Sequence, residues 1–130
     1  MKAGDEVPAL ERTIGAADMI AYAGATWDWH RLHHDAAYLR ARGLDRPVVD
    51  GQLFGALLAE QVQDWLGPDA RLRRLRFRLL SMVFAGESVR VTGIVTGVVT
   101  GVEGTLVTVE QKVLVAGRVA AGGTAQAVLP

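Results

Sequence analysis

Apolar residues recur every three or four positions in the first part of the chain. Between Thr13, which can cap a helix N-terminus, and Thr26, this spacing predicts an amphipathic helix. The polar stretch "WDWHRLHH" at 27–34 interrupts the pattern and is expected to form a loop. Asp35 then offers a good N-cap for a short helix that Gly43 closes. The first part of the chain is therefore predicted to be helical.

A second, longer helix is predicted over 51–66, "GQLFGALLAEQVQDWL", ending at Gly67-Pro68. Its apolar side chains cover much of the helix circumference, which is typical of a helix buried on most sides. The preceding stretch 44–50 is expected to be extended, because a residue before proline (Pro47) is pushed out of the helical region.

The second half of the chain changes to period two. Leucine and phenylalanine alternate with arginine over 74–84, and further strand-like stretches follow at 87–100, 105–117 and 118–129, separated by glycine-containing turns. One long buried helix followed by about four antiparallel strands predicts an α+β fold in which a curved sheet wraps the helix. No linker interrupts 1–130, so a single domain is expected.

Composition narrows the classes of function. The 130 residues include 14 Lys and Arg against 14 Asp and Glu, so the zero net charge gives no general attraction to nucleic acid or anionic membranes. The absence of cysteine excludes disulfides, thiolate metal sites and thiol nucleophiles. No apolar run has the length of a signal peptide or a membrane span, so we expect a cytoplasmic protein.

All three histidines lie in the stretch "WDWHRLHHD", where a metal site is one interpretation. The available ligands are the histidines and the flanking carboxylates: His30, His33, His34, Asp28 and Asp35. A His-x-x-His-His run in a loop presents two side chains to one point more readily than three, and the chain has no further histidine. We therefore expect no metal. An exposed loop with no chemical role is a second interpretation.

An acid–base pair is the third interpretation of this stretch. Asp28 lies between Trp27 and Trp29, and large aromatic neighbours predict a partly buried wall that raises the pKa of a carboxyl group. His33, five residues further on, can accept or donate a proton at neutral pH. Asp28 and His33 could therefore face the same water molecule, an arrangement that is unspecific by itself.

Two further features have both a structural and a functional interpretation. The arginines of "RLRRLRFR" at 71–78 are expected on the solvent face of a strand, where contact with substrate phosphates is also compatible. Asp50 is expected to cap the long helix. The first N–H groups of that helix, at Gly51 and Gln52, together with its dipole form a potential oxyanion site.

Three blocks, "YAGATWDWHRLHHDAAY", "GLDRPVVDGQLFGALLAE" and "RFRLLSMVFAGESVRVTGIV", resemble the MaoC-like dehydratases of the hot-dog fold, which include (R)-specific enoyl-CoA hydratases. The resemblance covers about residues 15–100, with the blocks in the family's order. It implies that Asp28 is the catalytic aspartate and His33 the catalytic histidine; Leu32 and Asp35 also match. The departures from the family pattern are Trp27 for glycine, His30 for asparagine, Arg31 for proline, and Asp50 for the histidine common before Gly51.

The resemblance implies reversible syn hydration of trans-2-enoyl thioesters, or dehydration of (R)-3-hydroxyacyl thioesters, carried by CoA or acyl carrier protein. In this chemistry Asp28 and His33 hold one water, and the backbone N–H groups of Gly51 and Gln52 stabilise the thioester oxygen. No metal and no other cofactor is needed. Candidate substrate contacts are the aromatic and polar residues near these groups and two arginines for the carrier phosphates: Trp27, Trp29, His30, Asp50, Phe54, Arg71 and Arg73.

The resemblance also implies dimers with sheets side by side, and the zero net charge favours self-association, so a homodimer is expected. A heteromer with another hot-dog chain is the alternative. Two alternative functions stay open: an acyl thioesterase with Glu60 of the long helix as its carboxylate, and a non-catalytic subunit of a heteromeric dehydratase.

Overall fold

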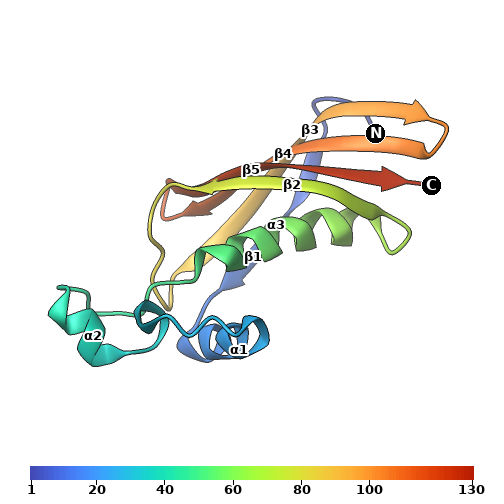
Figure 1. The fold of residues 1–130 in the computed structure, drawn as a ribbon. Helices are drawn as coiled ribbons and strands as arrows, with labels where there is room; N and C mark the ends of the chain where they lie inside the picture. The colour runs from blue at the N-terminus through green and yellow to red at the C-terminus, as the bar shows by residue number, and fades with distance from the viewer.

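The computed structural model describes residues 1–130. One strand and then the helical segments precede a run of long strands (Figure 1). Along the chain, the elements are β1 (Glu6–Thr13), α1 (Ala16–Thr26), the 3-10 helix η1 (Arg31–His33), α2 (Ala36–Ala41), α3 (Gly51–Leu66), β2 (Arg71–Leu79), β3 (Ser88–Gly101), β4 (Gly104–Val115) and β5 (Arg118–Leu129).

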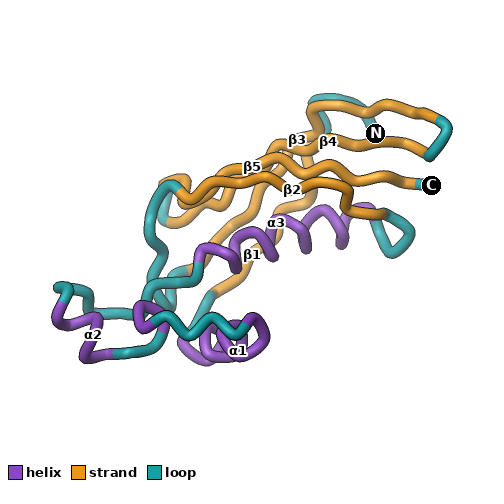
Figure 2. Tube along the Cα trace, in the orientation of Figure 1, coloured by secondary structure: helices purple, strands orange, loops and turns teal.

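The five strands form one antiparallel sheet in the order β1-β3-β4-β5-β2. Helix α3 runs along one face of this curved sheet and contacts all five strands (Figures 1 and 2). The helical segments α1, η1 and α2 lie together at the end where α3 begins. The predicted α+β architecture, a helix wrapped by a curved antiparallel sheet, is therefore confirmed.

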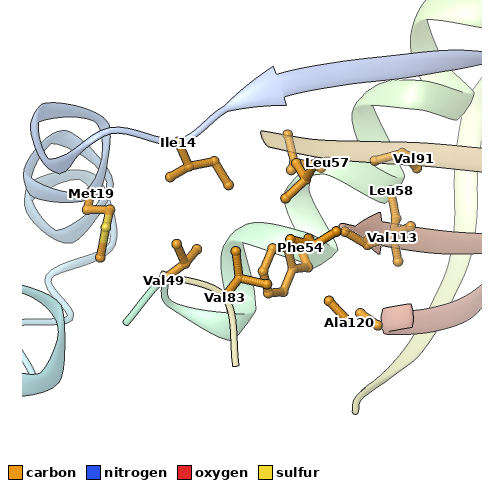
Figure 3. Close-up of a cluster of buried hydrophobic side chains, with 13 residues drawn as sticks. Ile14, Met19, Val49, Phe54, Leu57, Leu58, Val83, Val91, Val113 and Ala120 are labelled. Atoms are coloured by element: carbon orange, nitrogen blue, oxygen red, sulfur yellow. The ribbon is translucent and has the colours of Figure 1, made fainter. Parts of the chain in front are cut away.

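The core lies between α3 and the sheet. Phe54, Leu57 and Leu58 of α3 pack against buried valines of the strands, among them Val91 and Val113 (Figure 3). Removing this apolar surface from water supplies the main driving force for wrapping the sheet around the helix. Buried apolar side chains on several sides of α3 agree with the sequence pattern, in which apolar residues cover much of the helix circumference.

Strand β1 corrects the prediction of a purely helical first half. Thr13 ends this strand instead of capping α1, and Gly15 is the N-cap residue of α1. Most side chains of β1 are exposed, with Val7 the buried exception, so its sequence has no clear period-two pattern. Its pairing with β3 is a long-range contact, and the sheet consequently has five strands instead of about four.

Other predicted boundaries are confirmed. Asp35 caps α2 by accepting a hydrogen bond of 3.0 Å from the Tyr38 N–H. Helix α3 spans Gly51–Leu66, and Gly67 ends it with a φ of 87°, which favours glycine. Strand β2 stops at Leu79, earlier than the alternation suggested, and its arginines are exposed as expected for a solvent face. No helix is long and apolar enough to cross a bilayer.

Candidate active site

The loop after α1 and the residue before α3 bring three acid–base side chains together. Asp28, His33 and Asp50 each contribute one polar atom to a group in which all atoms lie within 4.8 Å of one another. The structure therefore brings Asp28 and His33 together as the sequence predicted. It also adds Asp50, which the sequence placed only as a helix cap and a possible substrate contact.

Backbone groups hold His33 in a defined orientation. The His33 Nδ1 lies 2.6 Å from the Val48 carbonyl oxygen. Because a carbonyl oxygen only accepts hydrogen bonds, Nδ1 carries the hydrogen and the Nε2 of the neutral ring is free to accept a proton. This Nε2 lies 3.9 Å from Asp50 Oδ2, and both side chains are only 13% exposed. His33 is thus presented as a base at the edge of the cluster.

The carboxyl groups of Asp28 and Asp50 lie close together, and their pKa values are shifted in opposite directions. Burial raises the pKa of Asp50, and its hydrogen bond with Asp28 raises it further. The hydrogen bond with Asp50, followed by one from the His30 N–H at 3.3 Å, lowers the pKa of Asp28. At neutral pH the pair therefore combines an ionised carboxylate at Asp28 with a less acidic carboxyl group at Asp50.

The expectation that the flanking tryptophans raise the pKa of Asp28 is wrong. Trp27 ends α1 with a φ of 59° and turns outward, leaving it 80% exposed, and Trp29 is also exposed. The two indoles contact each other edge to face, with ring centroids 5.9 Å apart, and do not bury the carboxylate. The carboxyl group raised by burial in this cluster is Asp50.

The other two histidines support the loop. His30 Nδ1 accepts a hydrogen bond of 3.1 Å from the Leu32 N–H, and His34 Nε2 lies 3.0 Å from the Trp29 carbonyl oxygen. The group of side chains with metal-ligand spacing contains His33 alone among the histidines. The structure therefore separates the roles of three residues that look equivalent in the sequence.

The N-terminus of α3 opens onto the cluster. The Gln52 N–H donates to Asp50 Oδ1 at 2.9 Å, so the cap already uses this predicted oxyanion donor. The first N–H of a helix has no partner within the helix, and none of the loop or cap hydrogen bonds uses the Gly51 N–H. The Leu79 side chain packs over Gly51, where a Cβ atom would collide with Leu79 Cδ1. Gly51 is thus the available donor.

Three predicted substrate contacts lie away from this cluster. Phe54 is 2% exposed and belongs to the core between α3 and the sheet (Figure 3). Arg71 and Arg73 lie towards the opposite end of β2 from Leu79, which is eight residues from Arg71 and six from Arg73, or roughly 26 Å and 20 Å along the strand. Arg73 pairs there with Glu103 at 2.8 Å. Within one chain, neither arginine is near the acid–base groups.

Tyr22 is a site residue that the sequence analysis missed. With Met19, Ala23, His33, Asp50 and Leu53 it lines a narrow cleft. Burial raises the pKa of its phenol, and the charges of Asp50 and Asp28 raise it further, so Tyr22 keeps its proton. Its helical spacing from Met19 was the only signal in the sequence, and that spacing is equally typical of a core position.

The fold and the comparisons define the class of protein. A long helix wrapped by a five-stranded antiparallel sheet is the hot-dog fold, and the structure of an (R)-hydratase from Aeromonas caviae involved in PHA biosynthesis has the same arrangement. That structure has a TM-score of 0.90 and 25% identity, covering 100% of this chain and 98% of that one. The chain belongs to the family of the MaoC-like domain, whose model matches residues 2–117.

Two further relatives were found. The (R)-specific enoyl-CoA hydratase of Aeromonas caviae is 33% identical over 88 residues, and the match spans 62% of this chain and 60% of that enzyme. A chain of the ChsH1-ChsH2 complex from Mycobacterium tuberculosis is 26% identical with a TM-score of 0.88, covering 98% of both chains. The resemblance inferred from the sequence is thereby confirmed at the level of the family.

Proposed function

We propose that this chain catalyses the reversible hydration of trans-2-enoyl thioesters to (R)-3-hydroxyacyl thioesters. The observation that carries this proposal is the meeting of Asp28, His33 and Asp50 beside the available Gly51 N–H at the start of α3. The similarity to an (R)-specific enoyl-CoA hydratase supports the reaction class. The acyl group is carried by CoA or by an acyl carrier protein.

The reaction uses one water held between Asp28 and His33. The water oxygen bonds to C3 of the enoyl group while one of its protons passes to the Asp28–His33 pair, and the pair delivers a proton to C2 on the same face. Dehydration runs the same steps backwards. The free Nε2 of His33 and the ionised Asp28 are both suited to hold the water and move its proton.

The thioester oxygen gains negative charge as the water adds. The Gly51 N–H, at the positive end of the α3 dipole, can donate a hydrogen bond to this oxygen. Glycine at this position lets the thioester come close to the backbone, provided that the Leu79 side chain moves aside. Leu79 is 51% exposed, so its tip has room to rotate. No cofactor is required for any of these steps.

The alternative functions have less support. Glu60, the carboxylate expected for a thioesterase, forms an ion pair with Arg12 and lies ten residues along α3 from Asp50, roughly 15 Å at 1.5 Å per residue. A non-catalytic subunit has no need of Asp28 and His33 in one cluster. The hydratase therefore remains the function that the geometry supports best.

A panel of trans-2-enoyl-CoAs of varied chain length and branching tests this function. We expect loss of the absorbance of the conjugated thioester, formation of the (R)-alcohol, no release of free thiol, and unchanged rates with a chelator present. Thiol release without hydration would instead establish a thioesterase. Inactivity of the chain alone, with activity restored by a second hot-dog chain, would establish a heteromeric enzyme.

We further propose that the chain forms a homodimer through β2. Both β1 and β2 are edge strands with unpaired backbone groups, but β1 contains Pro8 and a register shift that hinder pairing. Strand β2 also has a register shift, between Leu72 and Arg74, but it contains no proline and runs regularly from Arg74 to Leu79. Its exposed edge therefore suits antiparallel pairing with a second copy.

Charge on β2 makes the dimer sensitive to salt. A two-fold axis through paired β2 strands brings Arg74, Arg76 and Arg78 of both copies together, and none of these arginines has an acidic partner within the chain. We expect dimerisation to strengthen severalfold from low salt to about 1 M salt. At 1 M the Debye length is ~3 Å, so the repulsion between the arginines of the two copies is screened. Sedimentation velocity measures this. A monomer under both conditions would favour a heteromeric pair, as in the complex from Mycobacterium tuberculosis.

A further inference from the structure

Two glutamines are the buried polar side chains of this chain, and both lie between α3 and the sheet. Gln61 of α3 is 2% exposed, and Gln111 of β4 is 1% exposed. Burying an amide costs free energy unless hydrogen bonds replace those that it made with water. Apolar packing alone therefore does not explain these two residues.

All four amide hydrogens of the pair have acceptors. The Gln61 Nε2 donates to the Pro8 carbonyl oxygen at 2.9 Å and to the Val91 carbonyl oxygen at 3.0 Å. The Gln111 Nε2 donates to the Leu58 carbonyl oxygen and to Gln61 Oε1, both at 2.9 Å. Because each nitrogen faces two oxygens, the orientation of both amides is defined. The pair thus connects β4 with β1, β3 and α3 in one cluster.

The sheet has a local shape that fits the Gln61 amide. The pairing of β1 with β3 shifts register between Val7 and Leu10, so Pro8 has no partner in the ladder, and Gln61 supplies a donor to its carbonyl oxygen. A Cβ atom at Gly93 of β3 would lie only 3.1 Å from Gln61 Oε1. The register shift and the glycine therefore give the amide one defined position on the sheet.

The pair is not explained by stability alone. Gln111 Oε1 is buried and has no hydrogen-bond partner. A buried acceptor without a partner keeps its desolvation cost, and apolar side chains of the same shape can replace a buried polar pair with little or no loss of stability. The pair is better explained by the arrangement that it specifies.

The apolar residues of α3 do not define a single register along the sheet, because they recur every four positions. Three buried side chains follow one another at this spacing: Phe54, Leu58 and Val62. Gly51 and Gly55 do the same beneath Leu79 and Phe77 of β2. Sliding α3 by one turn, about 5.4 Å, would again place apolar against apolar side chains and a glycine beneath a large one. Apolar contact is non-directional and penalises such a slip weakly.

Gln61 is the residue that a slip of one turn would misplace. Leu57 and Trp65 lie four positions before and after it. Leucine has no polar atom, and the single N–H of tryptophan cannot replace three hydrogen bonds. Either residue in the place of Gln61 would leave the two strand carbonyls and the Gln111 amide short of partners, at the cost of their desolvation.

We propose that the Gln61–Gln111 amide pair fixes the register of α3 along the sheet and thereby places the Gly51 N–H beside Asp28 and His33. Gly51 begins the helix ten residues before Gln61, roughly 15 Å along the axis, and a helix moves as a unit over that length. Both glutamines are then positioning residues. The register follows from the fold alone, while its effect on turnover rests on the proposed hydratase function.

Methionine variants remove the amides and keep side chains of similar length. Gln61→Met leaves two carbonyls and one Gln111 N–H unpaired and should raise the unfolding equilibrium constant by on the order of 10²-fold or more. Adding Gln111→Met removes that N–H together with the unpaired Oε1, so the double variant should be about tenfold more stable than Gln61→Met. Denaturant unfolding measures both changes. A double variant less stable than Gln61→Met would contradict a coupled pair.

Gln63→Met is the matched control on the same helix. The Gln63 Nε2 also donates to two carbonyl oxygens, those of Gly67 at 2.9 Å and Ala70 at 3.0 Å, but its side chain is exposed. Water can replace these bonds, so stability should change by less than about tenfold. A loss as large as that of Gln61→Met would assign the effect to helix-to-backbone bonds in general and overturn the role of the buried pair.

Spin-label distances test the register directly and need no substrate. The chain has no cysteine, so Asp64→Cys near the end of α3 and Ser88→Cys, both exposed positions, take one label each. Ser88 precedes Val89, which packs in the core with the first half of α3, so the two labels are separated along the helix axis. We expect one narrow distance with both glutamines present. The double methionine variant should show a broader distribution or a second distance, shifted by up to ~5 Å. The same narrow distance in both proteins would overturn the proposal.

Turnover at a temperature where every variant is folded tests positioning. The double methionine variant should lose about 10²-fold in kcat with an enoyl-CoA, because a displacement of this size moves the Gly51 N–H away from Asp28 and His33. Gln63→Met should keep the turnover of the wild type. Wild-type turnover of the double variant with an altered label distance would remove the positioning role. Inactivity of all proteins, with the label distances as expected, would reject the hydratase function and leave the role in register intact.

Discussion

Asp28→Asn and His33→Ala should each lower turnover on the verified enoyl thioester by on the order of 10²-fold or more. The reason is that both side chains act on one water. Asp28 is held ionised by its hydrogen bonds, and His33 Nε2 is left free by the bond of Nδ1 to the Val48 carbonyl. Steady-state kinetics with matched circular dichroism spectra would measure the loss and check the fold.

The double variant gives the sharper result. If the two groups work as one unit, Asp28→Asn with His33→Ala should be little slower than the slower single variant. His34→Ala is the matched histidine control, because His34 is exposed and contacts only the Trp29 carbonyl oxygen among its polar neighbours. It should change turnover little. Full activity of Asp28→Asn would show that the hydratase assignment is wrong.

Gly51→Val should leave the fold intact and lower turnover by about 10²- to 10³-fold, the range for loss of one oxyanion donor. A branched side chain at the first position of α3 blocks the approach of the thioester oxygen to the Gly51 N–H. The new Cβ would meet the tip of Leu79, a half-exposed side chain that can rotate away, so folding should tolerate the change. Thermal unfolding and kinetics on the same preparation test both parts.

A substitution of Leu79 supplies the control for steric effects in the Gly51→Val variant. Leu79→Ala alone should stay active, because it only uncovers Gly51. Adding Leu79→Ala to Gly51→Val relieves the contact with β2 and should restore any lost stability without restoring turnover. If the combined variant regained wild-type turnover, the oxyanion donor would lie elsewhere, and Gly51 would matter only for packing against Leu79.

The elements that depend on local sequence were predictable. The bounds of α3 follow from apolar side chains over much of the helix circumference and from Gly67 directly after it. The strand-like runs of β3, β4 and β5 are separated by glycine-containing turns, so their order and approximate limits were readable. Asp28 and His33 could be predicted as neighbours because they lie five residues apart in one stretch and match a family motif.

Features that depend on distant residues required the tertiary structure. Strand β1 is mostly exposed and forms through pairing with β3, more than 70 residues away, so its own residues give no periodic signal. Trp27 was expected to bury Asp28, yet the left-handed turn at the end of α1 directs it outward.

The acid–base character of the site was likewise decided by tertiary contacts. Asp50 lies 22 residues from Asp28 in the chain, and only the docking of the loop against the start of α3 places their carboxyl groups together. Proximity of two charges and burial, which neither local spacing nor composition encodes, then shift the pKa values of the two groups in opposite directions. The sequence by itself determined the long helix, the later strands and the two motif residues, while long-range packing decided the environment that sets the acidity of Asp28 and Asp50.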